Sequence, residues 1–451
     1  MSVQAARGVS FVSEDRGVLA MPTSLPVEET VFFTGLTRRN FSIQSVVSRL
    51  WSGPLFAAAM PASSGAVEVA MPVVQLEFLD DFNMPSEPIW GPLTPGQLSG
   101  LMFDSSLKKF LSVSDDRFDS TNKKSRGHPR YYTLSISVSQ NSQTGKMEIT
   151  LSDKFESTYL VDKKGDYIPF ENGDGEGIVI LPNGNLAIAT EGQAEQGSKV
   201  EDRLLPLTSS SIDEFDRNGT WVRSYPIPSY YQPRFDMKGK QTRGVFRNNG
   251  FESLTIAGDS IFTATEGPLV QDGGAVTFER GGFTRIMLLK PKHGMYSPVK
   301  EFAYPVDAIP FPTSWGTDKP EGGENGISEM IALDENTLLV LERAFILKPY
   351  FRNHIRLYQV DLREATNTLG QKNISKDVRS VKKQLVLDFE DILPRLKPNE
   401  VQKKPVGNLE NYEAMAFVNL PDGSRGLVIA SDNNHNPPNQ RQVFLLFRFK
   451  N

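Results

Sequence analysis

The sequence predicts an all-β fold, a β-propeller of five blades closed into a ring, and three observations support this. Apolar stretches are short, while 36 glycines and 30 prolines in 451 residues supply many turns. One segment pattern recurs five times at nearly constant spacing, and the two chain ends offer strands that complete one blade between them. Six blades would require residues 30–70 to join the ring. An open solenoid would require a polar capping unit, which neither end resembles.

Each repeated segment has an acid, a small residue, an apolar strand, a turn, a second strand and a second acid. Ser99, Glu176, Glu252, Glu329 and Glu413 take the first position, in steps of 77, 76, 77 and 84 residues. Turn-forming residues such as those at 182–185 separate the two strands, so each segment predicts a hairpin. The segments are LSGLMFDSSLKKFLSVSDDR from Leu98, GEGIVILPNGNLAIATEGQ from Gly175, FESLTIAGDSIFTATEGP from Phe251, SEMIALDENTLLVLERA from Ser328, and YEAMAFVNLPDGSRGLVIASDNN from Tyr412.

Two further strands are expected after each hairpin, which gives four strands per blade. The fifth unit has room for only one of them before the chain ends, and residues 74–82 are expected to add the missing strand and close the ring. The expected outer strands are 131–138 and 147–152, 211–216 and 221–227, 283–289 and 299–306, 355–362 and 384–389, and 443–449.

Residues 1–70 are expected to form an N-terminal arm, and residues 71–451 the propeller domain. Within the arm, residues 36–66 place Arg38 and Arg39 before a moderately apolar stretch and a run of small residues. This resembles a twin-arginine export signal and predicts a periplasmic or secreted protein. The alternative is an irregular arm packed on the domain.

Composition excludes several classes of function. The net charge of −5 and the pI near 5.6 argue against a nucleic-acid partner. The chain has no cysteine, which excludes disulfides and thiolate chemistry, and no apolar run is long enough to span a membrane. No nucleotide-binding glycine loop or GxSxG motif is present. The sequence does not indicate an oligomeric state.

Equivalent positions in a propeller form a ring at one mouth of the channel, so the repeated acids are expected to meet there. Crowded carboxylates need a balancing cation or must take up protons. A divalent cation, with Ca²⁺ the preferred candidate, would satisfy them through oxygen ligands. Internal pairing with arginines that staple adjacent blades is the alternative. The expected metal ligands are Asp115, Glu176, Glu191, Glu252, Glu266, Glu329, Glu342, Glu413, Asp432 and Asn433.

The same mouth supplies the candidates for chemistry. A carboxylate would act as general base, an arginine would bind a substrate oxyanion in bidentate fashion, and His435 would donate a proton. The candidate catalytic residues are Asp116, Arg117, Glu176, Glu252, Glu329, Arg343, Glu413 and His435.

The motifs LSGLMFD with SDDR, GEGIVIL with ATEG, and NYEAMAF with ASDNN resemble the bacterial phytase-like esterase family over residues 74–449. The resemblance implies phosphomonoesterase or phosphodiesterase activity outside the cytoplasm, dependent on a divalent cation. Ser99 departs from the family's acidic pattern. The sequence lacks the dense lysine and arginine expected for binding phytate. The implied acidic positions are Asp115, Asp116, Glu176, Glu191, Glu252, Glu266, Glu329, Glu342, Glu413 and Asp432.

Three functions are consistent with these features. The first is an exported, metal-dependent hydrolase of small anionic phosphoric esters. The second is a non-enzymatic propeller that binds a partner or glycan and uses its acids as blade staples. The third is a Ca²⁺-dependent lactonase-type propeller, which also holds its ion with Glu and Asn ligands.

Overall fold

The chain divides into two units, Met1–Val69 and Ala70–Asn451, and the second is described here. In the computed structural model, the described residues are 72–84, 97–115, 128–169, 173–192, 199–200, 203–204, 208–311, 320–349, 351–397, 409–434 and 440–450. The expected export segment therefore lies outside the described residues, as do Asp116, Arg117 and His435.

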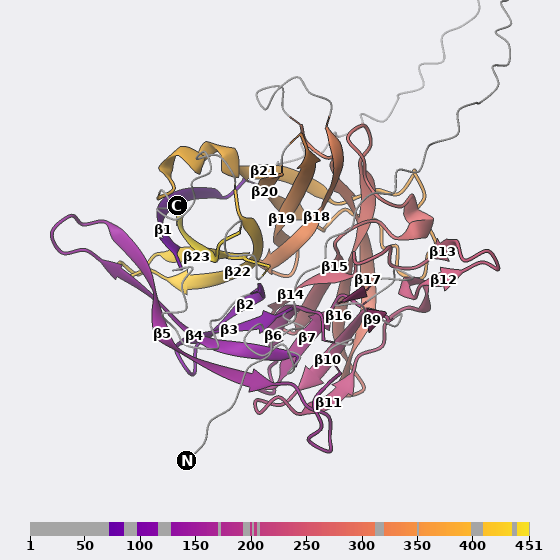
Figure 1. Ribbon diagram of the computed structural model, residues 1–451, viewed down its shortest axis with the longest axis horizontal. Coiled ribbons are helices and arrows are strands. Elements are labelled where there is room, and N and C mark those ends of the chain that lie inside the picture. The colour runs from indigo at the N-terminus through magenta and orange to yellow at the C-terminus, as the bar shows by residue number, and fades with distance from the viewer. Residues whose placement is uncertain are drawn as a thin grey trace, which may run out of the picture. The chain divides into compact units, whose positions relative to one another are not determined.

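Five four-stranded antiparallel sheets form the blades (Figure 1). The first blade contains β2 (Leu98–Asp104), β3 (Lys109–Ser114), β4 (Arg130–Gln140) and β5 (Met147–Tyr159). The second contains β6 (Gly175–Ile180), β7 (Leu186–Thr190), β10 (Ser211–Phe215) and β11 (Trp221–Ser224). The third contains β14 (Phe251–Ala257), β15 (Ser260–Thr265), β16 (Gly282–Lys292) and β17 (Met295–Val306). The fourth contains β18 (Glu321–Ala332), β19 (Thr337–Lys348), β20 (Arg352–Asp361) and β21 (Lys382–Asp388). The fifth contains β22 (Asn411–Asn419), β23 (Arg425–Asp432), β24 (Val443–Lys450) and β1 (Gln75–Asn83).

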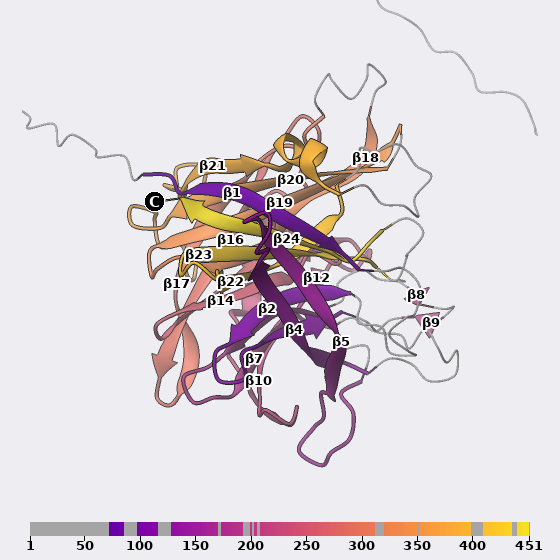
Figure 2. The same cartoon turned by 90° about the vertical axis from the view of Figure 1, so that its left-hand side faces the viewer.

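The inner strands close into a ring. Strand β2 contacts β6, β6 contacts β14, β14 contacts β18, β18 contacts β22, and β22 contacts β2. The last blade is completed by β1, which pairs with β24 in an antiparallel ladder, so segments from opposite ends of the described chain lie side by side (Figure 2). The five-bladed propeller and its closure through the N-terminal strand are thereby confirmed.

Hydrophobic residues pack mainly between neighbouring blades. Each of five buried clusters draws its side chains from two adjacent sheets; for example, Ile188 of β7 packs with Val113 of β3, and Ile429 of β23 packs with Leu341 of β19. This explains the sequence pattern. Inner strands such as β6 are covered on both faces and read as continuous apolar runs, whereas β5, at the outer edge, begins with alternating buried and exposed residues.

Several short elements lie in the connections between the strands of the blades. The two-stranded sheets are β8 (Lys199–Val200) with β9 (Arg203–Leu204) and β12 (Arg234–Phe235) with β13 (Gln241–Arg243). The 3₁₀ turns include η2 (Ser229–Tyr231), η3 (Val270–Asp272), η5 (Phe389–Asp391) and η6 (Leu393–Arg395). Among the described residues, no helix is long and apolar enough to cross a membrane.

Candidate functional site

Every inner strand carries a β-bulge, at its second or third residue in four blades and at the eighth residue of β18. The ladder between the first two strands of each blade skips one residue, which a bulge leaves unpaired and re-aims. In the second blade, Gly175 pairs with Thr190 and Gly177 with Ala189, so Glu176 is the skipped residue. The bulged residues of the five blades are Ser99, Glu176, Glu252, Ser328 and Glu413.

A second set of equivalent positions lies at the end of the hairpin. Glu191 follows the last residue of β7, and its backbone N–H donates to the carbonyl of Asp174 at 2.9 Å. Glu266 donates in the same way to Gly250, at 2.8 Å. The residues at this position are Asp115, Glu191, Glu266, Arg343 and Asp432.

The fourth blade therefore differs from the sequence prediction by one residue. Glu329 and Glu342 were expected in the ring, but the bulge places Ser328 and Arg343 there. Glu329 occupies the position of Gly177, which faces the neighbouring inner strand. Its carboxyl group is buried and accepts hydrogen bonds from the backbone N–H groups of Met330, at 2.8 Å, and of Met415 in the next blade. The prediction that Glu329 faces the mouth was wrong, because each inner strand contains one extra residue.

Glu342 points toward partners in the third and fourth blades and does not line the cavity at the mouth. Its carboxylate accepts from Tyr304 Oη at 2.8 Å and from Asn325 Nδ2 at 3.3 Å. Lys383 Nζ lies 2.5 Å away and Arg356 Nη2 3.4 Å away. These partners neutralise a carboxylate with no exposed side-chain surface, so Glu342 is a structural anchor, and its predicted place in the ring was wrong.

Three of the bulged residues and all five hairpin-end residues line a cavity of about 420 Å³ at one end of the channel. It is rich in carboxylates and amides, while Phe345 and Phe351 supply an aromatic edge. Its lining residues are Asp115, Glu176, Glu191, Arg247, Asn248, Asn249, Glu252, Glu266, Glu324, Arg343, Phe345, Phe351, Asn353, Asn411, Glu413, Asp432, Asn434 and Gln440. We call this the acidic cavity.

Predicted site residues from different blades thus come together. The predicted residues that line the acidic cavity are Asp115, Glu176, Glu191, Glu252, Glu266, Arg343, Glu413 and Asp432. Asn433 is not among its lining residues, although its side-chain oxygen accepts from the backbone N–H of Gln97 at 3.3 Å. The neighbouring residue, Asn434, lines the cavity instead.

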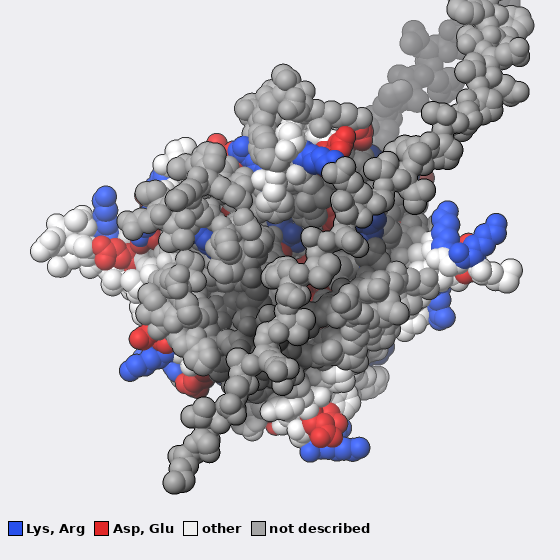
Figure 3. All heavy atoms as spheres, viewed as in Figure 1, with Lys and Arg blue, Asp and Glu red and all other residues white. Residues whose placement is uncertain are grey.

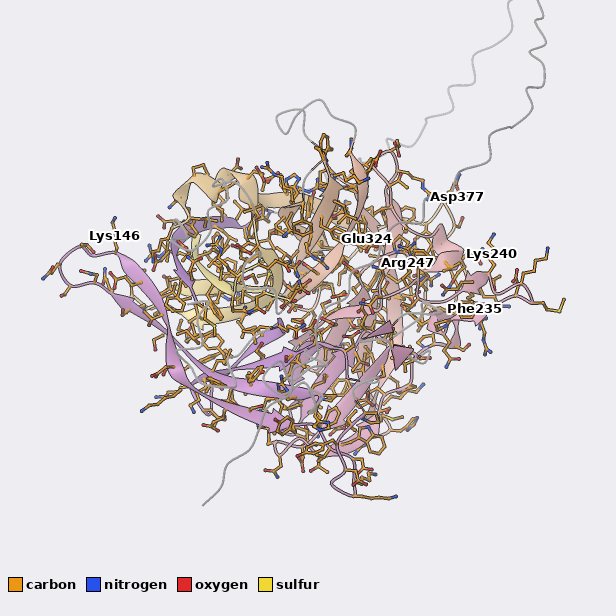
Figure 4. All side chains as sticks on the ribbon, viewed as in Figure 1. Lys146, Phe235, Lys240, Arg247, Glu324 and Asp377 are labelled. Carbon is orange, nitrogen blue, oxygen red and sulfur yellow. The ribbon has the colours of Figure 1, made fainter. Side chains whose placement is uncertain are left out.

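Two arginines face these acids. Arg343 Nη2 lies 2.8 Å from Glu266 Oε1 and 3.1 Å from Glu413 Oε1, so it bridges the third and fifth blades. Arg247 is more exposed and lies 3.8 Å from Glu324, and Figure 4 shows the two near the middle of the face viewed. Around the periphery of that face, described acidic and basic side chains stand in mixed groups (Figure 3).

Burial makes four of the ring carboxylates hard to ionise. Desolvation, followed by the charge of Glu252, raises the pKa of Glu191 well above its ordinary value, and the two carboxyl groups share a hydrogen bond. Desolvation also raises the pKa of Glu252 and of Asp432, which hydrogen-bonds Glu413. For Glu266, desolvation outweighs the charge of Arg343 and raises the pKa to about 7. The cavity therefore has a strong demand for cations or protons.

Two groups of acids are close enough to hold an ion. One ligand oxygen from each of Glu191, Glu252 and Glu266 lies within 4.8 Å of the others, and all three residues are buried. Asp115, Asp174 and Glu176 meet the same criterion. In each group, a hairpin end meets the bulge of the following blade, so these buried acidic clusters could bind a metal ion.

Sequence reasoning missed some residues of this region. Asp174 lies two residues before Glu176, outside the repeated acidic positions of the hairpins. Glu324 belongs to β18, the inner strand with the longest N-terminal extension, and accepts from Asn249 Nδ2 at 3.2 Å. Arg247 also lines the cavity, whereas Arg352 pairs with Glu390 at 2.8 Å.

Several solved structures are similar to this chain. A glycosyl hydrolase from Bacteroides ovatus has 10% identity and a TM-score of 0.31, covering 82% of this chain and 94% of that one. A structure from work on GH130 glycoside hydrolases that target β-1,2 mannosidic linkages in Candida mannan has 10% identity and a TM-score of 0.32. The match covers 82% of this chain and 94% of that one. The WD40 propeller domain of Doa1 has 10% identity and a TM-score of 0.23, and the match covers 83% of this chain and 96% of that one.

Comparison with curated protein sequences gives no significant match. A family model, described as phytase-like with an esterase-like activity of phytase, matches residues 94–435, which include the inner strands of all five blades. The chain therefore belongs to the phytase-like esterase family and is a hydrolase-like propeller protein.

Proposed function

We propose that the protein is a divalent-cation-dependent hydrolase of small phosphoric esters, with its site in the acidic cavity. The carrying observation is the buried group Glu191, Glu252 and Glu266, whose ligand oxygens lie within 4.8 Å of one another. Three carboxylates in that space are destabilised unless a cation or protons balance them. Family membership supports the hydrolytic part of the proposal.

The donor set suits a hard cation. Both acidic groups offer carboxylate oxygens only, and Asn249 and Asn411 add amide oxygens to the lining. Such ligands favour Ca²⁺ or Mg²⁺ over metals that prefer nitrogen or sulfur. We propose Ca²⁺, because a site with many carboxylate oxygens matches its larger coordination number. A bound cation would polarise a phosphoryl oxygen of the ester.

The chain's own residues would bind the ester and move protons. Arg343 and Arg247 present guanidinium groups to an anionic ester, although Arg343 is already held by Glu266 and Glu413. Glu252 or Glu191, in its ionised form, would accept a proton from an attacking water. A cavity of about 420 Å³ matches a small-molecule substrate.

The test is hydrolysis of p-nitrophenyl phosphate and bis-p-nitrophenyl phosphate, which separates monoesterase from diesterase activity. EDTA should abolish turnover and Ca²⁺ should restore it. Glu252→Gln should lower kcat at least 100-fold, on the scale of losing a general base. Glu329→Gln is the matched control, because its amide oxygen can still accept the two backbone hydrogen bonds. Folded wild-type protein without turnover of either ester, and without calorimetric Ca²⁺ binding, would refute the proposal.

A non-enzymatic role is the second candidate, favoured by one observation. Arg343 neutralises two ring carboxylates from different blades, as a staple would. In that case Glu252→Gln would change the melting temperature and no reaction rate. Including lactones in the substrate panel separates the third function, a Ca²⁺-dependent lactonase, from the phosphoesterase.

We also propose that the protein is exported to the periplasm or beyond. The support is the pair Arg38 and Arg39 before a weakly apolar stretch. Replacing both with lysine in the full chain should retain it in the cytoplasm, as measured by cell fractionation. Export that continues in this variant would refute the twin-arginine route.

A further inference from the structure

A second cavity lies at the other end of the same inner strands. The acids stand near the start of these strands, whereas residues further along them surround a space of about 390 Å³. The five inner strands all contribute to it, through apolar side chains such as Met102, Ile256 and Phe417. Its lining residues are Leu101, Met102, Phe103, Ile178, Val179, Leu254, Thr255, Ile256, Met330, Ile331, Ala332, Met415, Ala416, Phe417, Val418, Asn419, Gly423 and Arg425. We call this the apolar cavity.

Arg425 is the one charged residue of this lining. Its guanidinium carbon lies 3.6 Å from the centre of the Phe417 ring and 5.4 Å from that of Phe449. Among the described residues, no carboxylate forms an ion pair with it. Partial burial lowers the pKa of Arg425, with no neighbouring carboxylate to offset the effect. The stacked aromatic ring fixes the guanidinium but leaves its N–H donors available.

The acids near this end of the channel are engaged elsewhere. Asp422 is close to Arg425 in sequence, but it pairs with Arg448 Nη2 at 2.5 Å and accepts from Ser424. Asp259 and Glu335, in the turns of the third and fourth blades, both lie near Lys290. Within the described part of the chain, Arg425 is therefore a cation without a paired carboxylate, beside the apolar cavity.

We propose that the apolar cavity binds a small organic anion with an apolar body, such as a medium-chain alkyl carboxylate. The alkyl part would displace water from the aliphatic and aromatic lining, and the carboxylate would pair with Arg425. The cavity volume falls within the range of small-molecule sites. This site is separate from the acidic cavity and does not depend on the proposed phosphoesterase activity.

Isothermal titration of the full-length protein with hexanoate, octanoate and decanoate, each below its micelle concentration, tests the proposal. Affinity should rise about fourfold per added methylene until the cavity is filled. Octanol should bind about tenfold more weakly than octanoate, and octyltrimethylammonium more weakly still. Equal affinity for octanoate and octanol, or no binding of either, would overturn the proposal.

Variants locate the site. Arg425→Gln should weaken octanoate binding about tenfold and leave octanol unchanged, while Arg425→Lys should retain most of the affinity. Arg234→Gln is the matched control, because Arg234 is exposed on the small β12–β13 sheet. Glu252→Gln, in the acidic cavity, should leave octanoate binding unchanged. Wild-type affinity in a folded Arg425→Gln variant would place the carboxylate elsewhere and refute the proposed site.

Discussion

At the residue scale, the decisive feature of the site is a basic residue at one position of the ring where the other blades carry an acid. Four of the five hairpins end in an acid at this position, whereas the hairpin of the fourth blade ends in Arg343. Its contacts with Glu266 and Glu413 hold one guanidinium between carboxylates of two different blades. Because these groups are largely buried, water cannot replace the arginine as a partner.

Replacing Arg343 with methionine should therefore destabilise the metal-free protein by about 3–5 kcal/mol, the usual effect of breaking a buried ion pair. Urea denaturation in EDTA measures it, with Arg234→Gln as the exposed control. Added Ca²⁺ should recover part of the loss, because a cation replaces the missing positive charge. An unchanged free energy of unfolding would show that the ring carboxylates are already neutralised by protons.

Glu266 predicts a pH dependence of stability. Desolvation raises its pKa to about 7 in the folded protein, against about 4.5 for an ordinary Glu. The folded state therefore holds a proton that the unfolded state has released, so the free energy of unfolding should fall as pH rises from about 4.5 to about 7. The loss should be no more than about 3 kcal/mol. The pKa is raised in the same way for three other acids, Glu191, Glu252 and Asp432.

Thermal melting of metal-free protein across this pH range checks the sign. Glu266→Gln should flatten the decline, since the neutral amide does not ionise, whereas Glu329→Gln should leave the contribution of Glu266 in place. A melting temperature that rises steadily from pH 5 to pH 8 in EDTA would contradict the prediction.

At the element scale, the hairpin and its bulge explain what sequence could predict. The strands, turns and closing strand followed from local patterns, because alternation and turn residues are legible in a single sequence. The bulge could not be predicted from the sequence. It displaces one residue per inner strand without changing composition, so the positions counted outward from the turn of the fourth blade selected Glu329 and Glu342.

One signal in the sequence could have corrected the fourth blade. The step from Glu176 to Glu252 is 76 residues, and another 76 residues lead to Ser328. Ser328 also follows an apolar residue, Ile327, as Glu252 follows Phe251. The presence of an acid one position later concealed this match. The partners of Glu342 could not be predicted, since they come from four other strands, β17, β18, β20 and β21.

The close approach of inner strands predicts the effect of a single methyl group. A Cβ added at Gly177 would lie 2.4 Å from the backbone nitrogen of Leu254 in the next blade. Gly177→Ala should therefore destabilise the protein by more than about 2 kcal/mol, because two inner strands must separate. Gly145→Ala is the control: it has space for the methyl group and costs about 1–2 kcal/mol for its left-handed backbone. Equal losses in urea denaturation would contradict the predicted contact.

At the scale of the whole molecule, the ring makes the two cavities possible. All five blades line both spaces. Acids lie at one end and apolar residues at the other, because the inner strands carry acids before their apolar residues and run in the same direction. Either site depends on closure, since opening one blade contact would separate residues from neighbouring blades. Closure in turn depends on β1, whose ladder with β24 covers the edge of the fifth blade.

Deleting residues 1–84 should therefore remove the closing strand, whereas deleting residues 1–69 should leave it intact. Strand β1 pairs with β24 along its length: Gln75 lies opposite Lys450 at one end, and Asn83 lies opposite Val443 at the other. Phe78 of β1 also packs edge-on against Phe447 of β24. Without it, the buried side of β24 and its backbone groups become exposed, which favours aggregation. The longer deletion should lower the melting temperature by more than 10 °C and add oligomers in size-exclusion chromatography, while the shorter deletion should behave as the full chain does. Similar melting of the two truncated proteins would mean that the four blades β2–β21 and the hairpin β22–β23 hold the ring closed by their own contacts, and the N-terminal strand would then be dispensable for both cavities.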